Sequence, residues 1–302
     1  MRIVNAHAHL IEPARFESSG IPRGVAVLKE VEASLPLLEP QRLIDQMDEA
    51  GIDTTILYAV DAPIIGASNE YVHGLCQKWP DRLIGFASVD PLQKGAAERL
   101  ERAVRDYGLR GLKLHPPLQK FAPDDRRVWP VYQKALELDI PVVLHVGTTP
   151  FGPLCRLAHA NPILVDEVAV EFPKLRIMLT HLGTLWHNQA FMVVEKNPNV
   201  FIDTAAYITE IPTVLTPDIV ERIGPEKIIF GTDYPMPCAG RIHRMKDFVD
   251  CINGLQLTEV ERSLIFSENV EALLSGQRPL SPGLSTASGR KPSGTNGASP
   301  KG

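Results

Sequence analysis

The sequence predicts a single α/β domain folded as an eight-stranded TIM (β/α)8 barrel over residues 1–274, followed by a tail. Short strand-like runs recur eight times, and helix-length segments separate most of them. From the second run onward the starts lie about 23 to 35 residues apart, which fits one strand-loop-helix-loop unit each. The chain of an open doubly wound sheet would also alternate between strands and helices. However, no strand is followed by a Gly-x-Gly-x-x-Gly turn, so the eightfold count favours a closed barrel.

The predicted strands are β-branched or aliphatic runs short enough to be buried in a parallel sheet. They cover residues 2–5, 54–60, 83–89, 111–114, 141–146, 176–180, 200–203 and 227–230. Apolar residues at spacings of three and four predict helices between them, as in Ala96, Leu100, Ala103 and Val104, in Val131, Ala135 and Leu138, and over about 163–172.

Two connections are too long and too rich in proline and glycine to be one regular helix. They cover residues 10–38 and 147–161, and both follow strands. Loops at the carboxyl ends of barrel strands line the active site, so we expect the first to form a lid or pocket wall and the second to lie beside it.

The last 28 residues, 275–302, differ in composition from the rest. Sixteen of them are Gly, Pro or Ser, and none is acidic. Such a segment cannot bury enough apolar surface to fold, so we predict a disordered tail.

Charge and composition exclude several classes of partner. The chain has 31 basic and 36 acidic residues, for a formal charge of −5, and removing the four basic residues of the tail leaves −9 on residues 1–274. A nucleic acid is therefore not an expected partner. No apolar run approaches the roughly 18 residues of a membrane span and no signal segment opens the chain, so we expect a cytoplasmic protein without membrane contact.

The four cysteines, Cys76, Cys155, Cys238 and Cys251, are too few and too far apart for a disulfide framework or a Cys-x-x-Cys metal site. We expect reduced thiols, mostly buried.

The strongest local signal is His7-Ala8-His9, because side chains two apart on a strand point to the same face and two imidazoles can then share a metal. For an isolated pair, two hydrogen-bonded histidines would be the simpler interpretation. Three further residues, His145, His181 and Asp233, each end a predicted strand. Since these ends converge on one mouth, four histidines and a carboxylate form a site suited to Zn²⁺, Mn²⁺ or Fe²⁺.

With these residues the sequence resembles the amidohydrolase superfamily, in the amidohydrolase-related branch that includes aminocarboxymuconate semialdehyde decarboxylase-like proteins. The resemblance covers residues 1–274 and rests on His7-Ala8-His9, residues 80–86 and 111–116, His145, residues 181–183 and residues 231–235. It implies that one metal, zinc first with manganese or iron as alternatives, is held by four ligands, and that His181 acts beside it. The implied ligands are His7, His9, His145 and Asp233.

Lys113, His115, Arg23 and Trp186 are the residues that we expect nearest the substrate. For Lys113 a buried ammonium or a clamp for a substrate anion is favoured over a carbamate bridging two metals. His115 is either pocket wall or structural cap, and Trp186 is more often packing than substrate contact.

Several other residues have both a functional and a purely structural interpretation. Asp203 could orient a metal ligand or cap a turn. Arg15, Arg23 and Arg241 could bind a carboxylate, although exposed arginines are the commoner case. We expect the remaining histidines to be solvated or at the pocket edge: His73, His159, His187 and His243.

The favoured function is a metal-dependent hydrolase of a small molecule, in which a metal-activated water attacks an amide, lactone or related carbonyl. Asp233 would accept the proton and His181 would stabilise the oxyanion, both as catalytic residues. The alternative is a non-oxidative decarboxylase of an aromatic or enoic acid, with Asp233 or His181 supplying a proton to carbon. A non-catalytic metal-binding barrel is a remote third, and a homodimer is left open.

Overall fold

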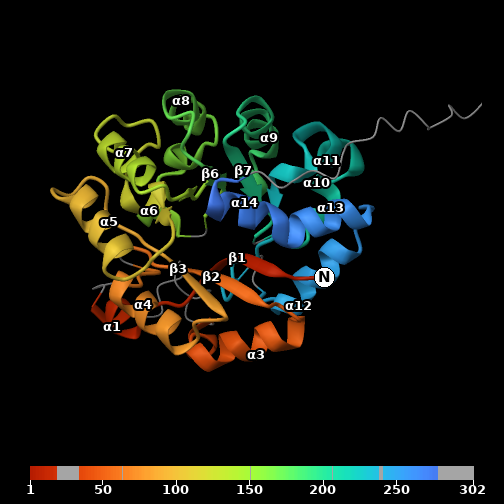
Figure 1. The fold of residues 1–302 in the computed structure, drawn as a ribbon, viewed down its shortest axis with the longest axis horizontal. Helices are drawn as coiled ribbons and strands as arrows, with labels where there is room; N and C mark the ends of the chain where they lie inside the picture. The colour runs from red at the N-terminus through yellow and green to blue at the C-terminus, as the bar shows by residue number, and fades with distance from the viewer. Residues whose placement is uncertain (19–33, 63, 150, 206, 238–240, 278–302) are drawn as a thin grey trace, which may run out of the picture.

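The computed structural model describes residues 1–18, 34–62, 64–149, 151–205, 207–237 and 241–277. Within these residues parallel strands form a central ring, and helices pack around its outside (Figure 1). The prediction of a TIM barrel is confirmed.

Each of the eight predicted strands is present at its expected place. They are β1 (Val4–His9), β2 (Thr54–Tyr58), β3 (Leu83–Phe86), β4 (Leu112–Leu114), β5 (Val142–Leu144), β6 (Ile177–Leu179), β7 (Val200–Asp203) and β8 (Ile228–Ile229). The first strand runs further than predicted, because its pairing with β2 continues through His9 opposite Tyr58. Both histidines of the His-x-His motif therefore lie on the strand itself.

The ring is closed at two seams. Strands pair in the orders β1-β2-β3 and β4-β5-β6-β7-β8. Isolated bridges join the two groups, Ala87 to Leu112 between β3 and β4, and Ala8 to Tyr234 between β1 and the segment after β8.

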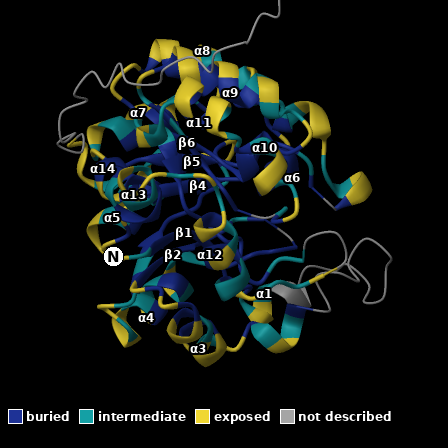
Figure 2. Cartoon of the chain, turned by 90° about the vertical axis from the view of Figure 1, so that its right-hand side faces the viewer, coloured by how far each residue is buried: buried dark blue, intermediate teal, exposed yellow. Residues whose placement is uncertain are grey.

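Helices cover the ring with their apolar faces turned inward, so that in Figure 2 the strands are buried and the outer helix surfaces are exposed. Side-chain caps set several helix starts, such as Ser68 before α4 and the Thr258 and Glu261 capping box of α13. The α-helices are α1 (Pro13–Ser18), α3 (Pro40–Ala50), α4 (Asn69–Lys78), α5 (Ala96–Arg105), α6 (Pro116–Gln119), α7 (Trp129–Glu137), α8 (Leu164–Glu171), α9 (His187–Lys196), α10 (Ile211–Val214), α11 (Pro217–Ile223), α12 (Met245–Asn253), α13 (Glu259–Ser263) and α14 (Asn269–Ser275).

Short 3-10 helices occupy several connections, and a π-helix, η7 (Leu264–Glu268), joins α13 to α14. The 3-10 helices are η2 (Leu35–Leu37), η3 (Gly152–Leu154), η4 (Leu157–Ala160), η5 (His181–Gly183) and η6 (Pro225–Lys227).

Parts of the long connections and of the tail lie outside the described residues. The first connection begins with α1, but residues 19–33, including Arg23, are among those not described. The second contains η3 and η4. The disordered tail stays a prediction, since residues 278–302 are not described either.

None of the helices in the described ranges is long and apolar enough to cross a membrane. Cys76, Cys155 and Cys251 are free thiols, as expected, but each is half-buried rather than fully buried. Cys238 is not described.

Candidate metal centre

Polar side chains from six strand ends gather at one mouth of the barrel, and all of them are buried. His7 and His9 lie on β1, and Asp203 ends β7. His115 and His145 directly follow β4 and β5, and His181 and Asp233 lie in the segments after β6 and β8.

Three potential ligand atoms, from His7, His9 and Asp233, lie almost equidistant from one another. His7 Nε2 is 3.1 Å from His9 Nε2 and 3.1 Å from Asp233 Oδ1, and His9 Nε2 is 3.3 Å from the same oxygen. Donors bound at 2.0–2.1 Å lie about 3.4 Å apart around a tetrahedral cation and about 3.0 Å apart around an octahedral one. The spacing therefore fits three ligands of a single divalent cation.

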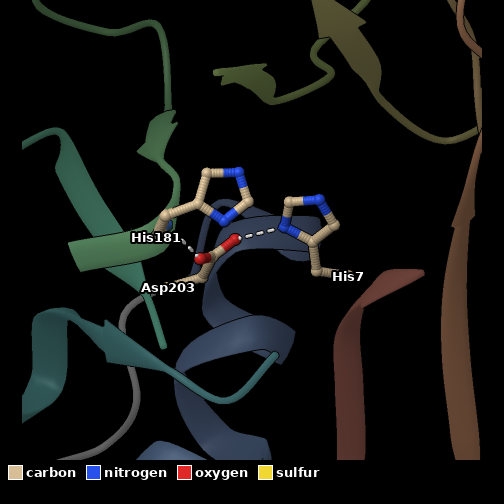
Figure 3. Close-up of side chains that lie close together, drawn as sticks. All are labelled: His7, His181 and Asp203. Atoms are coloured by element: carbon tan, nitrogen blue, oxygen red, sulfur yellow. Dashed lines mark hydrogen bonds and ion pairs between the residues drawn. The ribbon is translucent and has the colours of Figure 1, made fainter. Parts of the chain in front are cut away.

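The hydrogen bond on the far side of His7 sets which ring nitrogen faces this cluster. His7 Nδ1 lies 2.7 Å from Asp203 Oδ2 (Figure 3). The carboxylate accepts, so Nδ1 carries the hydrogen and Nε2 presents a lone pair to the Asp233 oxygen. A cation between these two acceptors would satisfy both, as in the carboxylate-histidine-metal arrangement of many metal sites.

His181 is held beside the cluster by the same carboxylate, because its backbone N–H donates to Asp203 Oδ1 at 2.7 Å. Asp203 Oδ1 also accepts from the backbone N–H of Ala205 at 3.1 Å. Of the two readings of Asp203, the structure thus supports both: it orients His7 and it caps a turn.

His145 lies next to His181 rather than within the three-atom cluster. Its Nδ1 is 3.1 Å from His181 Nε2, and its ring stacks on His115 with 3.9 Å between centroids. In the described residues, two groups of side chains have potential ligand atoms that all lie within 4.8 Å of one another. One group is His7, His9 and Asp233, and the other is His7, His181 and Asp203. Neither includes the implied fourth ligand.

Several ring nitrogens of the site have no hydrogen-bond partner among the described residues although they are buried. These are His9 Nδ1, His145 Nε2 and His181 Nδ1. Since leaving a buried polar atom unpaired is costly, they fit a site built to contact a metal or substrate.

The backbone at this mouth is strained. His181, Leu182 and Asp233 have φ values of 62°, 50° and 58°. Non-glycine residues in this region cost roughly 1–3 kcal/mol each and concentrate at functional sites.

The charges of the site suit a divalent cation. Burial works to raise the pKa of Asp233, but the adjacent imidazoles of His7 and His9 hold it well below its ordinary value. Burial lowers the pKa of both His9 and His181 to about 4. Near neutral pH the carboxylate is therefore charged and these imidazoles are neutral, as metal binding requires.

Lys113 is completely buried on β4, and its Nζ has no hydrogen-bond partner in the described structure. Burial lowers its pKa to about 8, against the opposing effect of Asp203 and Asp233. The ammonium lies 4.8 Å from the ring centroid of Tyr58, a cation–π distance.

Tyr58, at the end of β2, is a site residue that sequence reasoning missed. Its hydroxyl donates to the Ala6 carbonyl at 2.5 Å, and its ring lies 4.7 Å from that of His7. An aromatic residue inside an apolar strand is not distinguishable from core in the sequence. Its position at the strand end, in register with His9, was the available signal.

The other candidates lie away from the cluster or in its walls. Arg15 donates to Asp61 at 3.2 Å, and Arg241 is exposed. His115 Nδ1 accepts from the Leu118 backbone N–H at 3.3 Å and so caps α6. Trp186 is half-buried at the start of α9.

Two of the histidines that we expected to be solvated have specific partners. His73 Nδ1 lies 2.8 Å from the Tyr107 carbonyl oxygen. His187 bridges the Leu182 carbonyl and the Glu210 carboxylate.

A family model described as amidohydrolase matches residues 4–275, so this chain belongs to that family. The resemblance in the sequence is confirmed over nearly its whole predicted extent.

Curated relatives perform more than one reaction. Gamma-resorcylate decarboxylase of Rhizobium sp. (strain MTP-10005) is 27% identical over 81% of this chain and 89% of its own length. A 2-keto-4-carboxy-3-hexenedioate hydratase of Sphingobium sp. (strain NBRC 103272 / SYK-6) is 26% identical over 70% of this chain and 71% of its own.

Solved structures share the fold. A 2,6-dihydroxybenzoate decarboxylase complexed with 2,6-dihydroxybenzoate has a TM-score of 0.68 at 23% identity, covering 91% of this chain and 99% of its own. A dihydroxybenzoic acid decarboxylase from Polaromonas sp. JS666, with bound manganese and the inhibitor 2-nitroresorcinol, has a TM-score of 0.67 at 20% identity, covering 90% and 96%.

Proposed function

We propose that the protein is a metal-dependent non-oxidative decarboxylase of a small aromatic or enoic carboxylic acid. The observation that carries the proposal is the similarity to gamma-resorcylate decarboxylase along most of both chains. The sequence favoured hydrolysis with decarboxylation as the alternative, and the relatives support the alternative better. The site geometry is compatible with both reactions.

His7, His9 and Asp233 would hold the metal, supported by the spacing of their donor atoms. His145, through its unpartnered Nε2, is the fourth ligand expected from the family resemblance. The bound cation would supply a Lewis acid for a substrate oxygen. Manganese in a relative supports a divalent metal, while zinc stays a prediction.

His181 is the residue that we assign to proton transfer. Decarboxylation leaves an electron pair on carbon, and that carbon must take a proton as CO₂ departs. If His145 Nδ1 donates its hydrogen to His181 Nε2, then His181 Nδ1 carries the hydrogen and is otherwise unpartnered. This Nδ1–H is thus set to hydrogen-bond a substrate atom, and His181 would deliver a proton to carbon after taking one from an acidic group of the substrate, which returns the imidazole to its neutral form.

Asp233 fits a ligand better than a proton donor. A carboxyl group whose pKa lies well below its ordinary value is a weak base and is ionised at neutral pH. We therefore propose that Asp233 mainly holds the cation, and that its catalytic share is to accept a proton from a substrate hydroxyl or a water.

Lys113 and His115, two of the expected substrate contacts, receive different roles. Lys113 is fully enclosed, so we assign it an electrostatic role beneath the site. His115 supports His145 from the rim by stacking. Trp186 and Arg23 remain candidate substrate contacts.

The test is metal analysis followed by assay of the loaded protein against hydroxybenzoic and enoic acids, lactones, amides and enol acids. Release of CO₂ with proton incorporation at the vacated carbon supports the proposal. Carboxylate product from a lactone or amide without CO₂ would instead establish hydrolysis, and water addition to an alkene would establish a hydratase.

Three variants separate the assigned roles. His7→Ala should weaken metal binding, whereas Asp233→Asn should lose most activity while retaining an oxygen ligand. His181→Asn should leave the ligands in place and lower turnover by about 100-fold or more. Turnover of His181→Asn close to that of the parent would contradict the role given to His181.

A further inference from the structure

The loop that carries His181 adopts a backbone that its residues do not favour. His181, Leu182 and Gly183 have φ values of 62°, 50° and 69°, three consecutive residues in the left-handed region. The penalty for non-glycine residues there is roughly 1–2 kcal/mol each, so surrounding contacts must hold this turn.

Hydrogen bonds fix each peptide unit of the turn. The His181 N–H donates to Asp203, and the His181 carbonyl accepts from the backbone N–H and the hydroxyl of Thr184, both at 2.8 Å. The Leu182 carbonyl accepts from the ring of His187, with 2.8 Å between oxygen and Nδ1. The peptide unit between Leu182 and Gly183 is thus held on both sides, because its N–H donates to the Thr180 carbonyl at 3.0 Å and its carbonyl oxygen contacts the side chain of His187.

His187 is itself held from the next loop. Its Nε2 lies 3.1 Å from Glu210 Oε2, in the connection between β7 and α10, and both side chains are mostly buried, with 21% and 31% exposure. A carbonyl and a carboxylate are both acceptors, so each ring nitrogen of His187 must carry a hydrogen to make both bonds. His187 also opens α9, where a cation is disfavoured by the helix dipole, and the Glu210 carboxylate offsets that charge.

We propose that His187 and Glu210 form a positioning pair, a doubly protonated imidazole and a carboxylate, that keeps the His181 turn in its left-handed conformation and the His181 ring aimed at the substrate. The proposal rests on the proposed function only in treating His181 as the proton donor. His187 does not touch the reacting atoms and acts through Leu182.

Two substitutions distinguish positioning from general packing. In His187→Asn the side-chain amide nitrogen can occupy the place of Nδ1 and still donate to the Leu182 carbonyl, whereas His187→Ala removes the donor. We expect His187→Ala to lower kcat by about tenfold or more with KM within about twofold, and His187→Asn to recover most of that loss. Glu195→Gln, which breaks an exposed ion pair to Arg222 elsewhere on α9, is the matched control and should change neither constant.

A measurement on the metal-free protein tests the pair without activity. In ¹⁵N NMR both ring nitrogens of His187 should appear protonated, and the His181 ring signals should move in His187→Ala but not in His187→Asn or Glu195→Gln. An unprotonated nitrogen on His187, or parental kcat and unmoved His181 signals in His187→Ala, would overturn the inference. A protein with these NMR signatures but no CO₂ release would refute the proposed function and leave the positioning pair standing.

Discussion

At the residue scale, the hydrogen bond to Asp203 sets which ring nitrogen of His7 carries the hydrogen, and the exchange of one oxygen for nitrogen tests this. Asp203→Asn can keep Oδ1 as acceptor for the His181 and Ala205 N–H groups while Nδ2 replaces the oxygen that faces His7. The amide would donate to Nδ1 and move the imidazole hydrogen to Nε2, the atom that faces Asp233. We expect metal affinity to fall 10–100-fold with little loss of stability, measured by competitive chelator titration and thermal unfolding.

If Asp203→Asn bound metal as tightly as the parent, the assignment of His7 Nε2 as ligand would be wrong. Asp203→Ala serves as the comparison, because it removes the caps of His181 and Ala205 as well and should also lower the stability of the fold.

Lys113 makes the free energy of unfolding depend on pH. In the folded state its pKa is lowered to about 8 from an ordinary 10.5, so between these values the unfolded chain binds more protons and stability rises with pH. Metal-free Lys113→Met should be more stable than the parent near pH 7 by about 3 kcal/mol, and this lead should shrink as pH rises from 8 to 10.5.

The measurement is denaturant unfolding of both proteins across that window, with Lys94→Met, at an exposed position, as control. A lead that does not change between pH 8 and 10 would mean that Lys113 is not held as a destabilised ammonium.

The candidate site residues that the sequence predicted share one property: each is polar and lies at or just after the end of an apolar strand. His7, His9, His145, His181 and Asp233 could be predicted because the carboxyl ends of barrel strands converge whatever the loops do. The tautomer of His7, the displacement of His145 toward His181 and the role of His187 depend on side-chain geometry and left-handed turns, which no pattern of residue types encodes.

At the scale of elements, strand positions were predictable and strand ends were not. Continuous apolar runs mark strands buried on both faces, which is why all eight were found. β8 is only two residues long and β1 runs to His9, since pairing depends on register with the neighbouring strand. The helix expected over about 163–172 is α8, found over Leu164–Glu171.

The packing of α9 against the His181 turn can be tested with a pair of glycines. Gly183 and Gly51 have nearly the same φ, 69° and 68°, but a Cβ on Gly183 would clash with Cβ of Ala190 on α9, while one on Gly51 meets nothing within 4 Å. Gly51→Ala should cost about 1 kcal/mol of stability from backbone strain alone. Gly183→Ala should cost about 1–3 kcal/mol more because of the added clash, as measured by denaturant unfolding. Equal losses of stability in the two variants would show that α9 moves aside at no cost to accommodate the added methyl group.

At the scale of the whole molecule, the amidohydrolase match ends at residue 275 and α14 ends at Ser275. A chain truncated after Gln277 keeps the whole family match and α14. It should retain its melting temperature and turnover, because the removed residues 278–302 have too few large apolar side chains to dock stably on the barrel. A drop of several degrees in Tm would indicate that the tail packs on the barrel.

The proposed metal ligands His7, His9 and Asp233 span one of the two seams that close the barrel, so a bound cation should stabilise closure. His7 and His9 lie on β1 and Asp233 follows β8, and this seam is otherwise joined by hydrogen bonds such as His9 N–H to the Tyr234 carbonyl and Asp233 N–H to that of His7. The seam between β3 and β4 has similar bonds, Ala87 N–H to Gly111 and Lys113 N–H to Ala87, but none of the clustered ligands. It is an internal control within the same molecule.

We expect one divalent cation per chain, since the clustered donors of His7, His9 and Asp233 surround a single position and a buried ammonium is expected at Lys113 rather than a bridging carbamate. A ligand present at 100 times its Kd stabilises the folded state by about 2.7 kcal/mol, so chelation should lower Tm. Hydrogen exchange should then rise at the amides of His9 and Asp233 by more than at those of Ala87 and Lys113, because only the first seam loses its crosslink. Equal acceleration at both seams would mean that the cation stabilises the barrel globally, and two cations per chain would restore the bridged site at Lys113.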